Sequence, residues 1–541
     1  MSVCFQESRK ISILILVVIF LSSYLILSFN IEGQGIDIDE MFHHGFAMSY
    51  FDLTKEGKVL DPCITIQGEC KLIDLTCAGQ IQALASGGIV KGILVGLGDY
   101  FFSDSERKYY ASKEVQQPCR PIHNEVAIPG VNIPTQSELG AARFFSPIFG
   151  AMTVVLAFLI GKILFNRFTG ITFSIILLFH SLWMYHSRII TSEVYVNFFI
   201  ISTIFLFLYA FTSKEKILIK YLVLGTIIFA LAANTKITSL EILPFLIMII
   251  IFRGQVKEKM NFNKLKNRCF IKKSFFLVGI FFGVFIISLF ATFPFYWIDP
   301  IGQLLFQFEV ATNEEYGAIT EPSTHIKKIL LPFVESATII PIIDSYYYIF
   351  SPDNIPESAK GVNVLSPNNI TESAKGGHTF STIPLSLFFV VGIGYLVLKI
   401  KRKNLLFSEF IILAWYASVY IFLSLTLESY NTSRHFIPII FPMILIMSYG
   451  LWRFLKNFNY NKIKIFFISL VIFSHAITFL MFWEFIYFKP DIIWSLPSIF
   501  TLRDSLSNPI VMYSGIVFIL VFSLICIKKI KLKNVNYGNK V

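Results

Sequence analysis

Long apolar runs recur along the whole chain and limit its fold more than any other feature. A run of about 20 apolar residues can cross the hydrocarbon core of a bilayer as a helix, which satisfies its own backbone hydrogen bonds there. Hydrophobic residues make up 55% of the 541 residues and charged residues only 15%, which excludes a water-soluble globular protein. We predict an all-α polytopic membrane protein with about 12 transmembrane helices. The expected spans are 11–28, 144–164, 168–186, 194–211, 217–233, 239–252, 274–293, 384–398, 407–425, 436–452, 464–484 and 509–527.

The net charge of +11 is distributed unevenly between the two sides that these spans define. With a cytoplasmic N-terminus, most Lys and Arg residues fall on the cytoplasmic side. The acids that oppose them there are Glu7, Glu215, Glu258 and Glu409. This bias orients membrane proteins, so it predicts orientation and not a nucleic-acid partner. The basic runs at 253–273 and 399–403 are most simply orientation signals, with contact to anionic lipids as the alternative. We expect an active site facing the exterior of the plasma membrane, or the lumen of the endoplasmic reticulum in a eukaryote.

Two long polar segments separate the spans, and both are predicted to be external. Residues 30–143 form the first external loop and contain an acidic motif, whereas residues 294–383 contain a duplicated Pro/Ser/Asn-rich unit without evident chemistry. Residues 1–541 are expected to form a single membrane domain that ends in a basic cytoplasmic tail at 528–541.

Four of the seven cysteines lie in the first external loop. They are Cys63, Cys70, Cys77 and Cys119. An even number of external cysteines predicts one or two disulfides in an oxidising compartment, with four free thiols as the alternative. Zinc is disfavoured because the spacings lack the close pairs of structural zinc sites.

The stretch 35–50 directly follows the first span and holds three carboxylates within four positions. They are Asp37, Asp39 and Glu40. The apolar residues that follow recur at helical spacing, which predicts an amphipathic helix along the bilayer surface. These residues are Phe42, Phe46, Tyr50 and Leu53. The other side of this helix carries Glu40, His43, His44 and Ala47.

Further charged residues fall at the external ends of predicted spans. They are Arg188, Glu193, Lys236, Asp299, Arg434 and His435. Transfer from a phosphate-bearing lipid requires a carboxylate that deprotonates an acceptor hydroxyl and cations that neutralise the leaving phosphate. Taken singly, each of these residues is most simply a solvated turn residue. No Walker A sequence or Gly-rich dinucleotide turn occurs, so the donor is expected to be delivered by a lipid.

A divalent metal ion is a further candidate cofactor. Asp39 with His43, and Glu40 with His44, have the i, i+4 spacing of metal ligands on a helix. Ordinary polar residues on an interfacial helix are the simpler interpretation.

Five short motifs follow one another in a fixed order on the predicted outer side. They are Asp39-Glu40 with Phe42, Ala47, Gly57 and Asp61-Pro62; Ala142-Arg143 through Gly150 to Gly161 and Phe165; His186 and Arg188 with Glu193; Thr235-Lys236; and Arg434-His435-Phe436 with Pro438. This order resembles the GT-C glycosyltransferases, specifically the protein O-mannosyltransferase and lipid A aminoarabinose transferase group. The chain departs from the pattern at His435, where the family often has Tyr, and in its longer first loop.

The resemblance implies a membrane glycosyltransferase that moves mannose, or another hexose or pentose, from a polyprenyl-phosphate carrier to an acceptor hydroxyl with inversion. The acceptor would be a protein, a lipid or a glycan. By this resemblance the base is Asp39 or Glu40. The donor phosphate is bound by Lys236, Arg434 and, as a third cation, Arg188. The acceptor or a metal ion is oriented by Glu193, Asp37 and His43.

A transporter or flippase for a lipid-linked or anionic substrate is the alternative, because about 12 spans with both termini inside fit that class as well. Two features favour the enzyme: the two halves of the chain do not resemble each other, and the charges lie at span ends and not mid-span. A non-catalytic membrane scaffold is a third alternative, but it would give the acidic pair Asp39-Glu40 no role.

Overall fold

The computed structural model describes residues 2–29, 31, 38–58, 89–103, 136–212, 218–253, 259–260, 267–305, 387–426 and 437–456. These residues form helices and no strand, apart from one isolated antiparallel bridge between Lys259 and Leu406. The predicted all-α class is therefore confirmed. The expected spans at 464–484 and 509–527, the four external cysteines, the duplicated unit and the basic tail lie outside these ranges.

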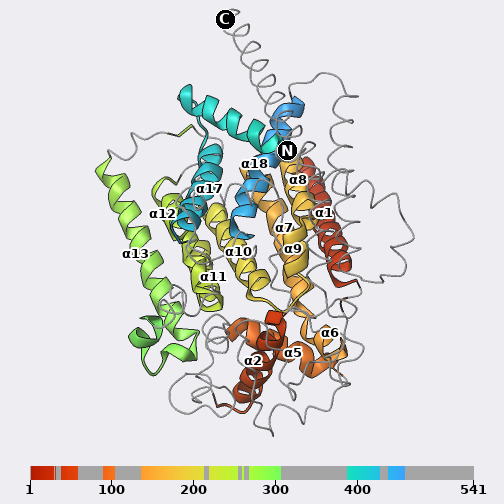
Figure 1. Cartoon of the computed structure of the whole chain (residues 1–541). Helices are drawn as coiled ribbons and strands as arrows, with labels where there is room; N and C mark the ends of the chain where they lie inside the picture. The colour runs from red at the N-terminus through yellow and green to blue at the C-terminus, as the bar shows by residue number, and fades with distance from the viewer. Residues whose placement is uncertain are drawn as a thin grey trace, which may run out of the picture.

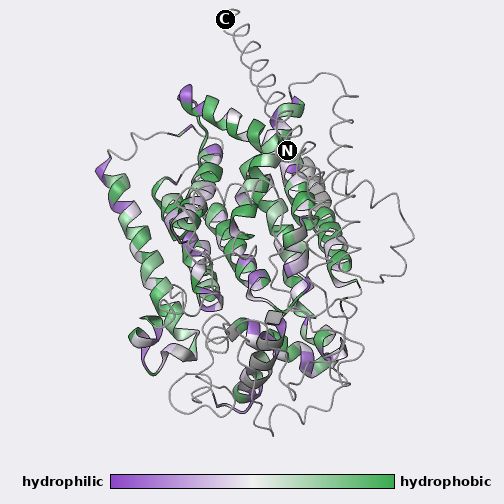
Figure 2. Ribbon diagram, in the orientation of Figure 1, coloured by the Kyte–Doolittle hydropathy of each residue, from purple (hydrophilic) through white to green (hydrophobic). Residues whose placement is uncertain are grey.

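The helices of the bundle run roughly side by side (Figure 1). They are α1 (Ser2–Ser28), α7 (Phe145–Leu164), α8 (Arg167–Leu178), α9 (Ser181–His186), α10 (Ser192–Thr212), α11 (Ile219–Thr235), η1 (Ile237–Ile242), α12 (Leu243–Ile251), α13 (Arg268–Ala291), α17 (Phe407–Thr426) and α18 (Ile437–Lys456). Figure 2 shows that apolar residues dominate these helices and that hydrophilic residues gather at their ends.

Five helical segments within the described ranges are long and apolar enough to cross a membrane. They are Ser137–Leu164, Ser192–Phe211, Arg268–Ala291, Phe407–Ser424 and Ile437–Lys456. The chain is an integral membrane protein, and the count of 12 spans stays a prediction. The expected span at 168–186 is divided between α8 and α9, and the one at 239–252 between η1 and α12.

Three helices outside the bundle cover one of its ends (Figure 1). They are α2 (Ile38–Lys55), α5 (Ile89–Phe102) and α6 (Gln136–Ala142). They lie at the end where α1 and α11 finish and where α7 and α10 begin. The connections that carry the predicted charged residues therefore meet this cap of three helices.

Glycines bring α2 and α5 into close contact. A Cβ atom at Gly96 would overlap Phe51 Cβ and lie 3.2 Å from the carbonyl oxygen of Ala47, and one at Gly92 would lie 3.3 Å from Tyr50 Cδ1. Tyr50 is only 3% exposed, so it packs inside the protein, while the position of α2 along the bilayer surface stays a prediction. The physical reason for this burial is that α5 is a second apolar helix, and it covers the side of α2 on which Tyr50 lies.

Gly96→Ala is expected to destabilise the protein by about 1–3 kcal/mol, because the added methyl group forces α2 and α5 apart. Thermal unfolding in detergent measures the effect. Gly279→Ala in α13 is the matched control, since a Cβ there meets nothing within 4 Å. Equal unfolding temperatures for the two variants would show that the close approach of α2 and α5 is unimportant.

Candidate active site

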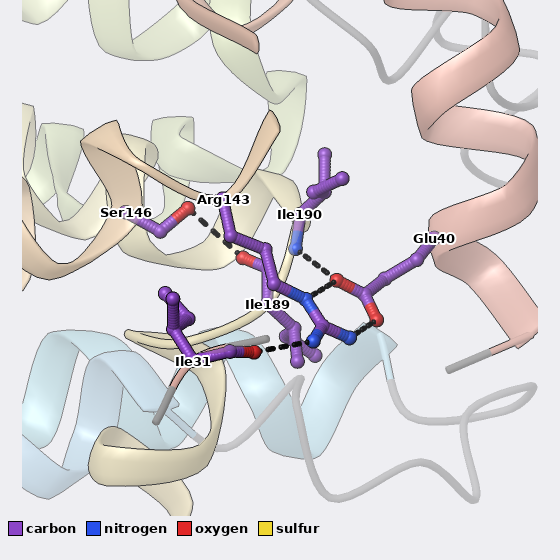
Figure 3. Close-up of polar contacts among 6 residues, drawn as sticks. All are labelled: Ile31, Glu40, Arg143, Ser146, Ile189 and Ile190. Carbon is purple, nitrogen blue, oxygen red and sulfur yellow. Dashed lines mark hydrogen bonds and ion pairs between the residues drawn. The ribbon is translucent and has the colours of Figure 1, made fainter. Parts of the chain in front are cut away.

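Glu40 in α2 forms a buried ion pair with Arg143 at the end of α6 (Figure 3). Arg143 Nε donates to Glu40 Oε1 at 2.8 Å, and its Nη2 donates to Oε2. Glu40 Oε1 also accepts a hydrogen bond of 2.7 Å from the backbone N–H of Ile190, while Arg143 Nη1 donates to the carbonyl of Ile31. Both side chains have 0% exposure. This pair joins α2, α6, the end of α1 and the link before α10.

Burial of this pair bears on which acid acts as the base. A buried carboxylate that accepts two hydrogen bonds from a guanidinium and one from the backbone is fixed in place. Both Glu40 oxygens are engaged in this way, which is the behaviour of a structural residue. Asp39 precedes it in α2, and its Cα is rotated by about 100° around the helix axis. Which of the two acids acts as the base stays a prediction.

Arg188 closes the end of α1. Its Nη1 donates to the carbonyl of Leu27 at 2.7 Å and its Nη2 to the carbonyl of Phe29 at 2.9 Å. The last carbonyls of a helix have no partner within the helix, and a cation there also complements the helix dipole. With 1% exposure, Arg188 has the contacts of a helix-capping residue. These contacts support an architectural role more directly than the predicted role in phosphate binding.

Glu193 and Lys236 lie together as the sequence motifs suggested. Lys236 Nζ donates to Glu193 Oε1 at 2.8 Å, and the two side chains are 15% and 5% exposed. Glu193 stands in the first turn of α10, and Lys236 directly follows α11. Asn234 fixes that end of α11, because its Nδ2 donates to the carbonyl of Leu289 in α13 and to Oγ1 of Thr292, which directly follows α13.

A second lysine, Lys91 in α5, lies in the same cluster. Its Nζ is 2.6 Å from His43 Nδ1 and donates to Ser192 Oγ at 3.2 Å. Lys91 belongs to none of the sequence motifs described above. One sequence feature could have identified it: Lys91 is the single cation within the apolar run 89–98. A charge in such a run normally faces the protein interior and has a partner there.

Electrostatic interactions join these residues into one site. Burial lowers the pKa of Lys91 to about 7, with Glu193 acting to raise it and Lys236 to lower it further. Burial also lowers the pKa of His43 well below its usual value, and the positive charge of Lys91 acts in the same direction. Each is the expected response of a cationic group that is removed from water.

The cluster formed by His43, Lys91, Ser192, Glu193 and Lys236 is the candidate active site. Of the predicted residues, it contains Glu193, Lys236 and His43, whereas Glu40 and Arg188 make the contacts described above; the predicted roles of these two residues stay predictions. Asp37 and Arg434 lie outside the described ranges, and for Asp39 the backbone position alone is described. Within the ranges that the structure describes, no group of three or more His, Cys, Asp or Glu residues could hold a metal ion. A divalent cofactor stays a prediction.

Comparison with known proteins gives a match to a family model. Residues 132–291 match the model of the dolichyl-phosphate-mannose-protein mannosyltransferases. Over these residues the predicted resemblance to the protein O-mannosyltransferases is confirmed. The matched segment runs from α6 to α13 and includes Arg143, Arg188, Glu193 and Lys236. Comparison with curated protein sequences gives no significant match.

Solved structures show a distant similarity. ArnT from Cupriavidus metallidurans, bound to undecaprenyl phosphate, is 10% identical with a TM-score of 0.47; the match covers 94% of this chain and 76% of that one. The Archaeoglobus fulgidus oligosaccharyltransferase, tethered to an acceptor peptide, is 11% identical with a TM-score of 0.44; the match covers 86% and 55%. These values are too low to bear on substrate or mechanism.

Proposed function

We propose that this protein transfers a glycosyl group from a polyprenyl-phosphate carrier to an acceptor hydroxyl at the end of the bundle covered by α2 and α5. One observation carries the proposal: two lysines, Lys91 and Lys236, flank the carboxylate of Glu193 in a buried cluster within a membrane protein. Buried cations at the membrane edge suit a lipid-borne phosphate, which has to enter laterally from the bilayer.

In the proposed step, the acceptor oxygen attacks the anomeric carbon while the bond from that carbon to the phosphate oxygen breaks. The electron pair leaves with the polyprenyl phosphate, and the hydroxyl proton moves to Asp39. Attack from the face opposite the phosphate inverts the anomeric centre. Lys236 and Lys91 stabilise the negative charge on the leaving phosphate. Both cations are preorganised, because they occupy these positions before the reaction begins.

Glu193 positions Lys236 in this scheme. The ion pair of 2.8 Å fixes the ammonium at the end of α11, where a free lysine side chain would sample many rotamers. His43 positions the ammonium of Lys91 in a similar way, through the contact between His43 Nδ1 and Lys91 Nζ. The scheme gives Arg143 no contact with substrate, because its guanidinium is already engaged by both Glu40 oxygens and by the carbonyl of Ile31.

The proposal is tested by incubating purified protein with radiolabelled polyprenyl-phosphate sugars and candidate acceptors. Transfer of label to a protein, lipid or glycan acceptor is the expected result, and it identifies sugar and acceptor together. In a parallel experiment with sealed vesicles, movement of the intact labelled lipid between leaflets without transfer would instead establish a transporter or flippase.

Apparent donor affinity is expected to fall as the pH rises through about 7, the pKa of Lys91. Below that pH the ammonium is charged and attracts the phosphate, whereas above it the neutral amine does not. His43 has a lowered pKa and stays neutral in this range, so it does not contribute the transition. The measurement is KM for the donor between pH 6 and pH 8.5. Lys91→Gln should reduce the pH dependence and the exposed control Lys58→Gln should retain it; an unchanged profile in Lys91→Gln would exclude Lys91.

A further inference from the structure

Two loops meet at the end of the bundle opposite the candidate active site, the end that the charge distribution predicts to be cytoplasmic. One loop follows α12 and the other precedes α17. The N–H of Met260 donates to the carbonyl of Leu405 at 2.8 Å, and Lys259 forms an antiparallel bridge with Leu406. This pairing holds Lys259 beside the turn that ends the helix over 387–401.

That turn has a backbone conformation seldom adopted by lysine. The N–H of Asn404 donates to the carbonyl of Lys399 and the N–H of Lys403 to that of Ile400, a pattern in which glycine normally occupies the position of Lys403. Lys403 has φ of +52°, in the left-handed region. A side chain there costs free energy that glycine would avoid.

Positive charges gather around this turn. The ammonium of Lys399 interacts electrostatically with Lys259, Arg402 and Arg453, and with the carboxylate of Glu409. That carboxylate is already engaged, since it accepts hydrogen bonds from Tyr449 Oη, the N–H of Leu406 and Arg453 Nη2. Among the residues of these two loops that the structure describes, no acid occurs to offset the other cations.

Apolar side chains and a tryptophan adjoin the cations. Val397 and Ile400, on either side of Lys399 in the sequence, are 53% and 52% exposed. Trp452 lies under Arg453, with the guanidinium 4.6 Å from its ring centroid, and tryptophan is typical of the headgroup level of a bilayer. A ligand that fits has an anionic group attached to an apolar chain.

We propose that Lys259, Lys399, Arg402 and Lys403 form a binding site for the phosphate of an anionic phospholipid in the leaflet at this end of the bundle. Lys259, Arg402 and Lys403 are exposed and Lys399 is half-buried, and a cluster of cations of this kind attracts anionic lipids. The bridged loops preorganise the cations. The exposed Val397 and Ile400 contact the acyl chains, which distinguishes a phospholipid from free phosphate.

Native mass spectrometry and thermal unfolding of the purified full chain in neutral detergent test the site, with phosphatidylglycerol, phosphatidylcholine and inorganic phosphate as probes. Phosphatidylglycerol is expected to bind saturably and to raise Tm, whereas the other two do not. Lys399→Gln with Arg402→Gln should weaken its affinity about 25-fold, at about fivefold for each charge removed. The control pair Lys272→Gln with Lys273→Gln, exposed in α13 at the same end, should leave the affinity unchanged.

Lys403→Gly separates loss of ligand from loss of structure. It relieves the left-handed backbone strain, so Tm without lipid should stay the same or rise while phosphatidylglycerol affinity falls about fivefold. The proposal is overturned if phosphatidylglycerol binds the double variant as tightly as the unchanged protein. It is also overturned if inorganic phosphate alone produces the same rise in Tm, or if the control pair weakens binding equally.

Discussion

Asp39→Asn is expected to lower the rate of glycosyl transfer by about 10²–10⁴-fold, the range that general base catalysis contributes. The amide cannot accept the proton of the acceptor hydroxyl, but it keeps the size of the side chain. Because the lost interaction belongs to the transition state, kcat should fall while KM for the donor and Tm change little. Transfer of radiolabel by the purified variant measures the effect.

Glu40→Gln provides the comparison that separates the two acids. Its expected phenotype is a lower Tm and a lower yield of folded protein, with activity per folded molecule reduced less than in Asp39→Asn. If Glu40→Gln folded normally and lost all transfer while Asp39→Asn stayed active, Glu40 would be the base. Full activity in both variants would exclude this acidic pair from the chemistry.

Arg143→Met is expected to destabilise the protein by about 3–5 kcal/mol, because it leaves the carboxylate of Glu40 buried without its cation. Glu40→Leu should cost a similar amount by leaving the guanidinium unpaired. The double variant is expected to recover most of the loss, since an apolar pair of similar volume removes both desolvation costs. Thermal or denaturant unfolding in detergent measures the three variants.

The exposed pair of Lys58 with Glu56 is the control for this cycle. Its side chains are 59% and 53% exposed, and exposed ion pairs contribute about 0–1 kcal/mol. Glu56→Gln should therefore leave Tm nearly unchanged. If Arg143→Met lowered Tm as little as Glu56→Gln does, the buried pair would not hold α2 against the bundle.

Sequence patterns located several residues of the site but could not assign their partners. Thr235-Lys236 and Glu193 were identified at span ends, and the ion pair between Lys236 and Glu193 then joined the two ends. Glu40 and Asp39 were indistinguishable in sequence because they are adjacent. They became distinguishable through Arg143, which lies 103 positions from Glu40.

Two other outcomes depended on contacts distant in sequence. Tyr50 follows the helical spacing of a membrane-facing residue, and its burial is decided by Gly92 on α5. Lys91 belongs to an apolar run without a recognisable motif, and its role is suggested by His43 and by Ser192, which is 101 positions away. Periodicity predicts which side of a helix is apolar, but it does not predict what covers that side.

The sequence by itself determined the class of the protein, because helix formation in a bilayer depends on the length of apolar runs, which is a local property. It also determined that charged residues lie at the ends of those runs. Only the tertiary structure decided which of the charged residues neutralise one another as framework and which gather in the candidate site. The reason is that a buried charge is defined by its partner, and the partners here belong to helices far apart in the chain.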